Sequence, residues 1–326
     1  MFIRPADLSD TQVGEAVGWF WSLAVESVAY APVGFGSHHW LVVADGQRWF
    51  VTVDRVNQGV PSRGGEAEPL DRLTAALTTV RSLADLGMTF AVAPVPTSVA
   101  DLLVPIQGKW VAALFPFVDG EKHRWGPFAG RSDRMAVLDL LALLHTAPER
   151  ARQHAFVDRF EVQSRDRLET ALTDREEEWR SGPYGESTRR LLEEHAGYIL
   201  EQLGRYDRLV DDIASRPGRM VITHGEPHRA NTITTASGIV LVDWDTVLVA
   251  PPERDVWWLA REDVTVPEEY ERRTSITIDT EALELYRLRW NLGDLASFAA
   301  QFREVHVDNE DTRTAWNGFA AILEGA

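Results

Sequence analysis

The strongest constraint on the fold is the unequal distribution of strand-like and helix-like patterns along the chain. Two β-rich runs, Trp40–Ala44 and Arg48–Val53, flank the dipeptide Asp45-Gly46, which is typical of tight β-hairpins. Short apolar runs near 99–105 and 110–117 predict further strands. Beyond about residue 120, helical periodicity dominates. This segregation predicts an α+β fold rather than alternating βαβ units.

Local signals place several helices. Ser9 and Gln12 form the pattern of a capping box, which predicts a short helix through Trp19. A second helical stretch runs from about Ala67 to Leu86 and ends before Gly87, a typical C-terminal cap. Later helices are expected over 133–145, 162–179, 185–204, 280–302 and 313–323.

The helical part is interrupted by one pair of short apolar segments, Met220–Thr223 and Ile239–Val242, which we interpret as paired strands. Pro and Gly residues within 115–120 mark a plausible hinge. We therefore predict a β-rich lobe at 1–118 and a larger, mainly helical lobe at 119–326.

Composition narrows the possible partners. The 326 residues include 33 Lys and Arg against 50 Asp and Glu, a formal charge of −17, which argues against nucleic-acid or anionic membrane partners and suits a cationic small molecule. There is no cysteine, which excludes disulfides and sulfur-based zinc sites. Without a secretory pattern, or an apolar run near the roughly 18 residues of a membrane helix, we predict a cytoplasmic protein. The sequence does not indicate an oligomeric state.

One segment carries the pattern of a catalytic site. His224-Gly225-Glu226 follows the first of the paired strands, Asn231 comes five residues after Glu226, and Asp243-Trp244-Asp245 follows the second strand. Carboxylate and amide oxygens are ligands that Mg²⁺ accepts, and a remaining carboxylate can face a substrate hydroxyl. Phosphoryl transfer requires this combination of a hydroxyl-orienting base and metal-binding oxygens.

This motif resembles the catalytic and metal loops of the aminoglycoside phosphotransferase and choline kinase family, small-molecule kinases with a protein-kinase-like fold. The family pattern is His-Gly-Asp-x-x-x-x-Asn followed by Asp, and the order of β-rich lobe, hinge and helical lobe agrees over nearly the whole chain. The resemblance implies Glu226 as catalytic base and Asn231 and Asp243 as catalytic Mg²⁺ ligands. It leaves the role of Asp245 open and implies that His224 fixes the loop.

The nucleotide site is expected in the first lobe. Gly34, Gly36 and Ser37 lie before the hairpin, where glycines let backbone amides approach a phosphate and a hydroxyl can donate to it. Phe115 and Phe117 in the hinge are candidates to contact the base of ATP or GTP. An ordinary turn at Gly34–Ser37 and simple core burial of the two phenylalanines are the alternatives.

Two departures from the family pattern stand out. Glu226 occupies the position where Asp is usual, and the added methylene moves the carboxylate by roughly 1 Å. The first-lobe lysine that pairs with nucleotide phosphates is missing, since Lys109 and Lys122 both lie outside the hairpin strand. Thr52, Asp54 and Arg55 occupy the candidate positions, and Arg55 could substitute as a charge.

The resemblance implies transfer of the γ-phosphate of ATP or GTP to a hydroxyl of a small molecule. The preferred acceptor is an aminoglycoside or aminocyclitol antibiotic, which would confer resistance or self-protection. Two alternatives stay open: a kinase of a sugar, amino alcohol or nucleoside, and a catalytically degenerate kinase fold that acts as a binding module.

Overall fold

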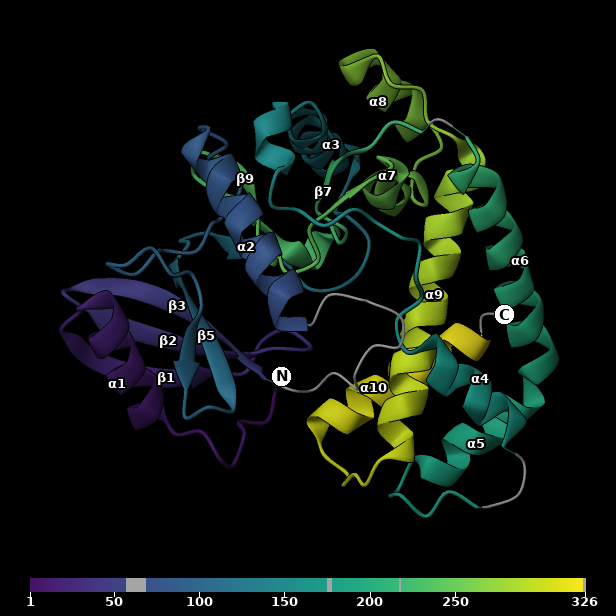
Figure 1. Ribbon diagram of the computed structural model, residues 1–326, viewed down its shortest axis with the longest axis horizontal. Helices are drawn as coiled ribbons and strands as arrows, with labels where there is room; N and C mark the ends of the chain where they lie inside the picture. The colour runs from purple at the N-terminus through teal and green to yellow at the C-terminus, as the bar shows by residue number, and fades with distance from the viewer. Residues whose placement is uncertain (57–68, 175–177, 217, 325–326) are drawn as a thin grey trace. The chain divides into compact units, whose positions relative to one another are not determined.

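The computed structural model describes residues 1–56, 69–174, 178–216 and 218–324 (Figure 1). The chain packs into two compact units, one made of Met1–Asp158 with Arg219–Ile278 and the other of Arg159–Gly218 with Asp279–Ala326. The predicted boundary between the two lobes, after residue 118, does not coincide with a boundary between these units, and it stays a prediction.

The first unit begins with a five-stranded antiparallel sheet. The Asp45-Gly46 turn joins its second and third strands as expected, with φ of 50° and 69° and Ala44 paired with Gln47. Only the end of the run near 99–105 forms a strand, and Val99 at its start is 75% exposed. In spatial order the strands are β1 (Val25–Ala31), β2 (His38–Ala44), β3 (Gln47–Arg55), β5 (Trp110–Pro116) and β4 (Val104–Ile106).

Helix α1 (Asp10–Trp21) covers one face of this sheet (Figure 1). The predicted capping box is confirmed, because the side chains of Ser9 and Gln12 each bond the other residue's backbone N–H. Trp40 is fully buried in the core beneath the helix, and its Nε1 donates to Asp10 Oδ1 at 2.8 Å. Burial of this aromatic and aliphatic core fixes the sheet against α1.

Alternation along β3 separates its two faces. Val51 and Val53 point into the core with α1, so Phe50, Thr52 and Asp54 project from the opposite face. Thr52 and Asp54 occupy candidate positions for the missing lysine, so this opposite face is the one relevant to the expected nucleotide site.

The rest of the first unit is helical with two small sheets. Helix α3 (Arg131–His145) packs against α7 (Glu253–Ala260), α8 (Val266–Thr274) and β7 (Val221–Thr223). Helices α7 and α8 have no counterpart among the sequence-based expectations, because both are short and neither has a long amphipathic repeat. The helices of this part are α2 (Pro69–Asp85), α3 (Arg131–His145), η1 (Glu149–Arg152), η2 (Arg229–Asn231), α7 (Glu253–Ala260) and α8 (Val266–Thr274). Ala67, at the expected start of α2, lies outside the described residues.

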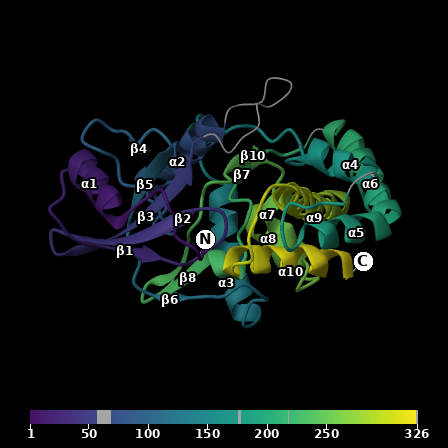
Figure 2. The same ribbon diagram turned by 90° about the horizontal axis from the view of Figure 1, so that it is seen from below.

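The expected pairing of the two late strands is wrong. β7 (Val221–Thr223) pairs with β10 (Leu248–Ala250). β9 (Gly238–Leu241) pairs with β8 (Thr232–Thr235). β8 also pairs with β6 (Glu121–Lys122), beside which it lies in Figure 2. The threonine-rich β8 reads as a polar loop in the sequence, so the true partner of β9 was not apparent.

The second unit is a helical bundle arranged around α9, which packs against each of the other four helices. The expected helix over 185–204 is interrupted at His195, where two helices meet. The helices are α4 (Arg165–Thr173), α5 (Gly185–Glu194), α6 (Ala196–Ala214), α9 (Thr280–Arg303) and α10 (Glu310–Glu324). Across the described ranges, no helix combines the length and apolar character needed to cross a bilayer.

Candidate active site

Helix α7 holds the loop that follows β7. The Asp255 carboxylate accepts hydrogen bonds from the backbone N–H groups of His224 at 2.8 Å and Gly225 at 2.6 Å. From the next turn of the helix, Trp258 Nε1 donates to the Gly225 carbonyl at 2.9 Å. These three bonds satisfy backbone groups that a buried loop would otherwise leave unpaired, and they fix the start of the motif.

Asp255 is itself supported from α3 and α8. His145 Nε2 donates to Asp255 Oδ2 at 3.0 Å, and His145 Nδ1 lies 2.7 Å from the hydroxyl of Tyr270. Burial works to raise the pKa of Asp255, but the hydrogen bond and charge of His145 and the charge of Arg254 outweigh it and hold the pKa below its usual value. Asp255 is therefore an ionised acceptor inside the fold.

Gly225 is tightly enclosed. Its φ is +100°, and a Cβ atom there would lie 2.7 Å from Arg254 Cζ. Arg254 cannot easily move, because its guanidinium donates to Thr223 Oγ1 and to the Thr246 carbonyl, each at 2.7 Å. The glycine of the motif is thus required by both backbone conformation and space.

His224 connects the catalytic loop to the metal loop. Its Nε2 lies 3.0 Å from the Val242 carbonyl, and its Nδ1 accepts the N–H of Glu226 at 3.2 Å. The ring packs on Trp244 with centroids 4.5 Å apart. Burial lowers the pKa of His224 to about 4, so the ring is neutral and serves as donor on one side and acceptor on the other.

The three predicted catalytic residues converge in the first unit. Asn231 ends the 3₁₀ turn η2, and its Nδ2 donates to the Glu226 carbonyl at 3.0 Å. The Asn231 carbonyl accepts the N–H of Val242 at 3.0 Å, which places Asp243 next in line. With Nδ2 engaged, Asn231 keeps Oδ1 for an incoming cation.

Asp243 is held in an uncommon backbone conformation, with φ of +67°. Within the described ranges its carboxylate has no hydrogen-bond or ion-pair partner, although it reaches solvent. Desolvation by the surrounding protein, and then the nearby charges of Glu226 and Asp54, raise the pKa of Asp243. Desolvation also raises the pKa of Asp245, as do the negative charges of Asp243, Glu226 and Asp54.

The donor set fits a divalent cation that also binds a phosphate. No group of three or more His, Asp or Glu in the described part of the chain could hold a metal by itself. Mg²⁺ usually takes one or two protein oxygens and completes its octahedron with water and substrate phosphates. An exposed, unpaired Asp243, one residue after the Val242 N–H that bonds the Asn231 carbonyl, matches that requirement, and a cation there would offset the crowding of negative charge.

The glycine-rich loop approaches this site from the sheet. Gly34 and Gly36 have φ of +72° and +104°, which favour glycine. Ser37 Oγ donates to Asp54 Oδ1 at 2.6 Å, and burial raises the pKa of Asp54. Asp54 thus places a carboxyl group where the family's lysine would bind the nucleotide phosphates. Its negative charge contributes to the raised pKa of Asp243.

Arg55 does not supply the missing cation. Its guanidinium donates to Asp7 at 2.8 Å and lies over the Trp110 ring, 4.8 Å from the centroid. Adjacent residues of a strand point to opposite faces, so Arg55 and Asp54 diverge.

The two hinge phenylalanines lie at the end of β5 beside β3. Phe115 pairs with Phe50 across the strands and is half-buried. Phe117 lies beneath the Arg48 guanidinium at 4.2 Å, and Lys122 Nζ is 5.3 Å from the same ring. Contact of either phenylalanine with a nucleobase stays a prediction.

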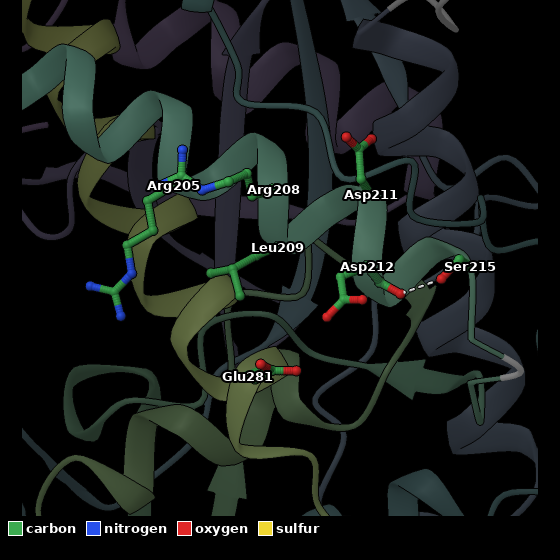
Figure 3. A pocket seen from close by; sticks show the side chains of 7 residues that line it. All are labelled: Arg205, Arg208, Leu209, Asp211, Asp212, Ser215 and Glu281. Carbon is green, nitrogen blue, oxygen red and sulfur yellow. Dashed lines mark hydrogen bonds between the residues drawn. The ribbon is translucent and has the colours of Figure 1, made fainter.

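The second unit contains a separate pocket between α6 and the start of α9 (Figure 3). None of the predicted site residues lines it. Much of its charge is already paired, as Arg205 bridges to Glu284 at 3.1 Å and Glu281 to Arg216. Its lining residues are Arg205, Arg208, Leu209, Asp211, Asp212, Ser215 and Glu281.

Replacing Gly225 with alanine should destabilise the protein by roughly 2–4 kcal/mol, because a positive φ and overpacking against Arg254 both add cost. Gly87→Ala is the matched control, since Gly87 has φ of +87° with nothing within 4 Å of an added Cβ, and should cost only about 1 kcal/mol. Urea unfolding measures both. Equal losses would contradict the enclosed geometry.

The buried neutral His224 should make stability fall in acid. The unfolded chain protonates this histidine near pH 6.5, whereas the folded protein resists until about pH 4, so protonation favours unfolding between those values. In His224→Gln, the slope of unfolding free energy against pH should be shallower there by up to about 1.4 kcal/mol per pH unit. His154→Gln, at an exposed histidine, should keep the wild-type slope. An unchanged slope in His224→Gln would refute the assignment.

Comparisons with known proteins identify the family and the fold of the chain. The model of the phosphotransferase enzyme family matches residues 28–311. Protein StrN of Streptomyces griseus is 31% identical over 144 residues, which are 44% of this chain and 42% of StrN, so the match spans less than half of that relative.

Solved structures share the fold. Spectinomycin phosphotransferase APH(9)-Ia, in complex with ADP and spectinomycin, superimposes with a TM-score of 0.74 at 14% identity, covering 98% of this chain and 97% of the other. Choline kinase LicA from Streptococcus pneumoniae gives 0.56 at 13% identity, covering 97% and 99%. The expected α+β, protein-kinase-like fold is confirmed. Because the family model covers most of the sequence, the chain belongs to the phosphotransferase enzyme family of small-molecule kinases.

Proposed function

We propose that this phosphotransferase transfers the γ-phosphate of ATP or GTP to a hydroxyl of an aminoglycoside- or aminocyclitol-type antibiotic. The observation that carries the catalytic part is the convergence of Glu226, Asn231 and Asp243 on a scaffold fixed by α7. The choice of acceptor is supported by the shared fold with a structure that contains spectinomycin and by the formal charge of −17, which suits a cationic acceptor.

In the proposed reaction, Glu226 orients the acceptor hydroxyl and accepts its proton. The hydroxyl oxygen forms a bond to the γ-phosphorus as the bond from that phosphorus to the β-bridging oxygen breaks, and the nucleoside diphosphate leaves with the electron pair. Glu226 has 28% of its side chain exposed, so an acceptor can reach it. The backbone of the loop stays fixed by Asp255, which limits reorganisation during the reaction.

Asn231 Oδ1 and the Asp243 carboxylate are the residues that would hold Mg²⁺. When bound, the ion would neutralise phosphate charge as it develops. Asp243 suits this role because its carboxylate is exposed and unpaired in the described structure, and because a cation would offset the nearby negative charges that, after desolvation, raise its pKa.

The glycine-rich loop contributes backbone N–H groups to the phosphates in this proposal. Gly34 and Gly36 allow the close approach. Ser37 is bonded to Asp54, so its hydroxyl must exchange that partner to donate to a phosphate.

Removing the proposed base or metal ligand should abolish most turnover. We expect Glu226→Gln to lower kcat by about 10²–10⁴-fold, since the amide cannot accept the proton. We expect Asp243→Ala to lower it by at least about 10²-fold, since a charge-stabilising contact is lost. Release of nucleoside diphosphate and product mass measure both. Asp211→Asn, in the second unit, is the control and should retain activity; an active Asp243→Ala enzyme would end the proposal.

The acceptor class is tested with a substrate panel. Aminoglycosides, aminocyclitols, macrolides, sugars, amino alcohols and nucleosides are each incubated with ATP or GTP, and products are identified by mass. We expect a singly phosphorylated aminoglycoside or aminocyclitol with the highest kcat/KM. Phosphorylation of a sugar, amino alcohol or nucleoside alone would reassign the protein as a metabolite kinase, and nucleotide binding without any product would indicate a binding module.

A further inference from the structure

A histidine outside the predicted catalytic set lies between two members of that set. The His228 side chain is only 9% exposed, and its Nε2 is 3.6 Å from Glu226 Oε2. The same nitrogen is 3.4 Å from Asn231 Nδ2, an amide donor from which it can accept while it carries no proton. One edge of this ring therefore faces both the proposed base and a proposed metal ligand.

Aromatic packing fixes the orientation of the ring. Trp125 packs edge-on against His228 with centroids 4.5 Å apart, and Trp258 packs edge-on at 5.0 Å. Trp258 is immobilised in turn, because it is buried and bonded to the Gly225 carbonyl. The ring thus has little freedom to turn its Nε2 away from Glu226.

The other ring nitrogen has no such role. His228 Nδ1 is buried and has no hydrogen-bond partner in the described structure. An unpaired buried nitrogen costs free energy, so Nδ1 contributes nothing that holds the ring in place. Packing sets its orientation, and the functional contact is at Nε2.

The contact depends on the length of residue 226. The family motif has aspartate there, whereas this chain has Glu226, whose extra methylene adds a rotatable bond and roughly 1 Å of reach. The 3.6 Å separation exceeds hydrogen-bond distance, and closing it requires Oε2 to move by roughly 0.5 Å, which the rotatable bonds of Glu226 permit. An aspartate at this position would have roughly 1 Å less reach toward the ring.

We propose that His228 is a positioning residue which holds the longer Glu226 carboxylate in line for the acceptor hydroxyl. It does so as the Nε2–H tautomer by donating from Nε2 to Oε2, which replaces the contact in which Nε2 accepts from Asn231 Nδ2, and it thereby compensates for the added methylene. This inference rests on the proposed phosphotransfer and adds to it a residue that acts only through Glu226.

Two substitutions of His228 separate positioning from packing. His228→Gln places an amide near the position of Nε2, whereas His228→Leu fills space without a donor. We expect His228→Leu to lower kcat by about 10–100-fold while KM for nucleotide and acceptor changes less than about threefold, because binding is intact and only alignment is lost. His228→Gln should recover at least about a third of the wild-type kcat.

The second comparison repeats His228→Leu in a Glu226→Asp background. Because the shorter aspartate has roughly 1 Å less reach toward the ring, the leucine substitution should change kcat there by less than about threefold, so the two substitutions are strongly non-additive. His154→Leu, at an exposed histidine, controls for loss of a histidine in general. Thermal unfolding and nucleotide affinity confirm that each variant is folded.

If the wild-type protein phosphorylates an acceptor, the proposed function holds, and three results would each still overturn the positioning role of His228. They are equal losses of kcat from His228→Leu in both backgrounds, no recovery by glutamine, and a loss confined to KM. If Glu226→Asp is inactive, recovery by His228→Gln relative to His228→Leu decides the question. A wild-type protein that phosphorylates nothing would remove the proposed function and this inference with it.

Discussion

The pair of hydrogen bonds from the backbone of His224 and Gly225 to the Asp255 carboxylate organises the first unit. A buried carboxylate is costly unless it is fully satisfied, and His145 supplies the remaining contact. Helices α3 and α7 and strand β7 are thereby tied to one charged group. The three proposed catalytic residues come after Gly225 in the chain, so their positions depend on the hydrogen bonds to Asp255.

The resulting site is crowded with negative charge. Desolvation first, and then the charges of Glu226 and Asp54, raise the pKa of both Asp243 and Asp245, and the charge of Asp243 also raises the pKa of Asp245. No lysine from β3 balances them, and Arg55 is engaged elsewhere. Such a site is better completed by cations than by anions alone, which is why a metal-bound triphosphate and a cationic acceptor suit it.

Much of this could be predicted from sequence, because the signals were local. The Asp45-Gly46 hairpin and the capping box at Ser9 each depend on a few adjacent residues. The spacing from Glu226 to Asn231 predicted two residues that the structure joins by a hydrogen bond. Their catalytic roles stay predictions.

The rest depends on contacts between distant segments. Asp255 lies about thirty residues beyond the backbone it holds, and no spacing rule marks it as the anchor. The partner of β9 was missed because the intervening β8 is polar. His228 could have been noticed beside Glu226, but its orientation is set by Trp125, which is far away in sequence.

The most direct test of the account is to locate the metal. The protein would be crystallised with a non-hydrolysable ATP analogue and Mn²⁺, and the manganese found by its anomalous scattering. The account predicts an ion bound by Asn231 Oδ1 and the Asp243 carboxylate together with phosphate oxygens. An ion bound to the phosphates and to neither residue would contradict it.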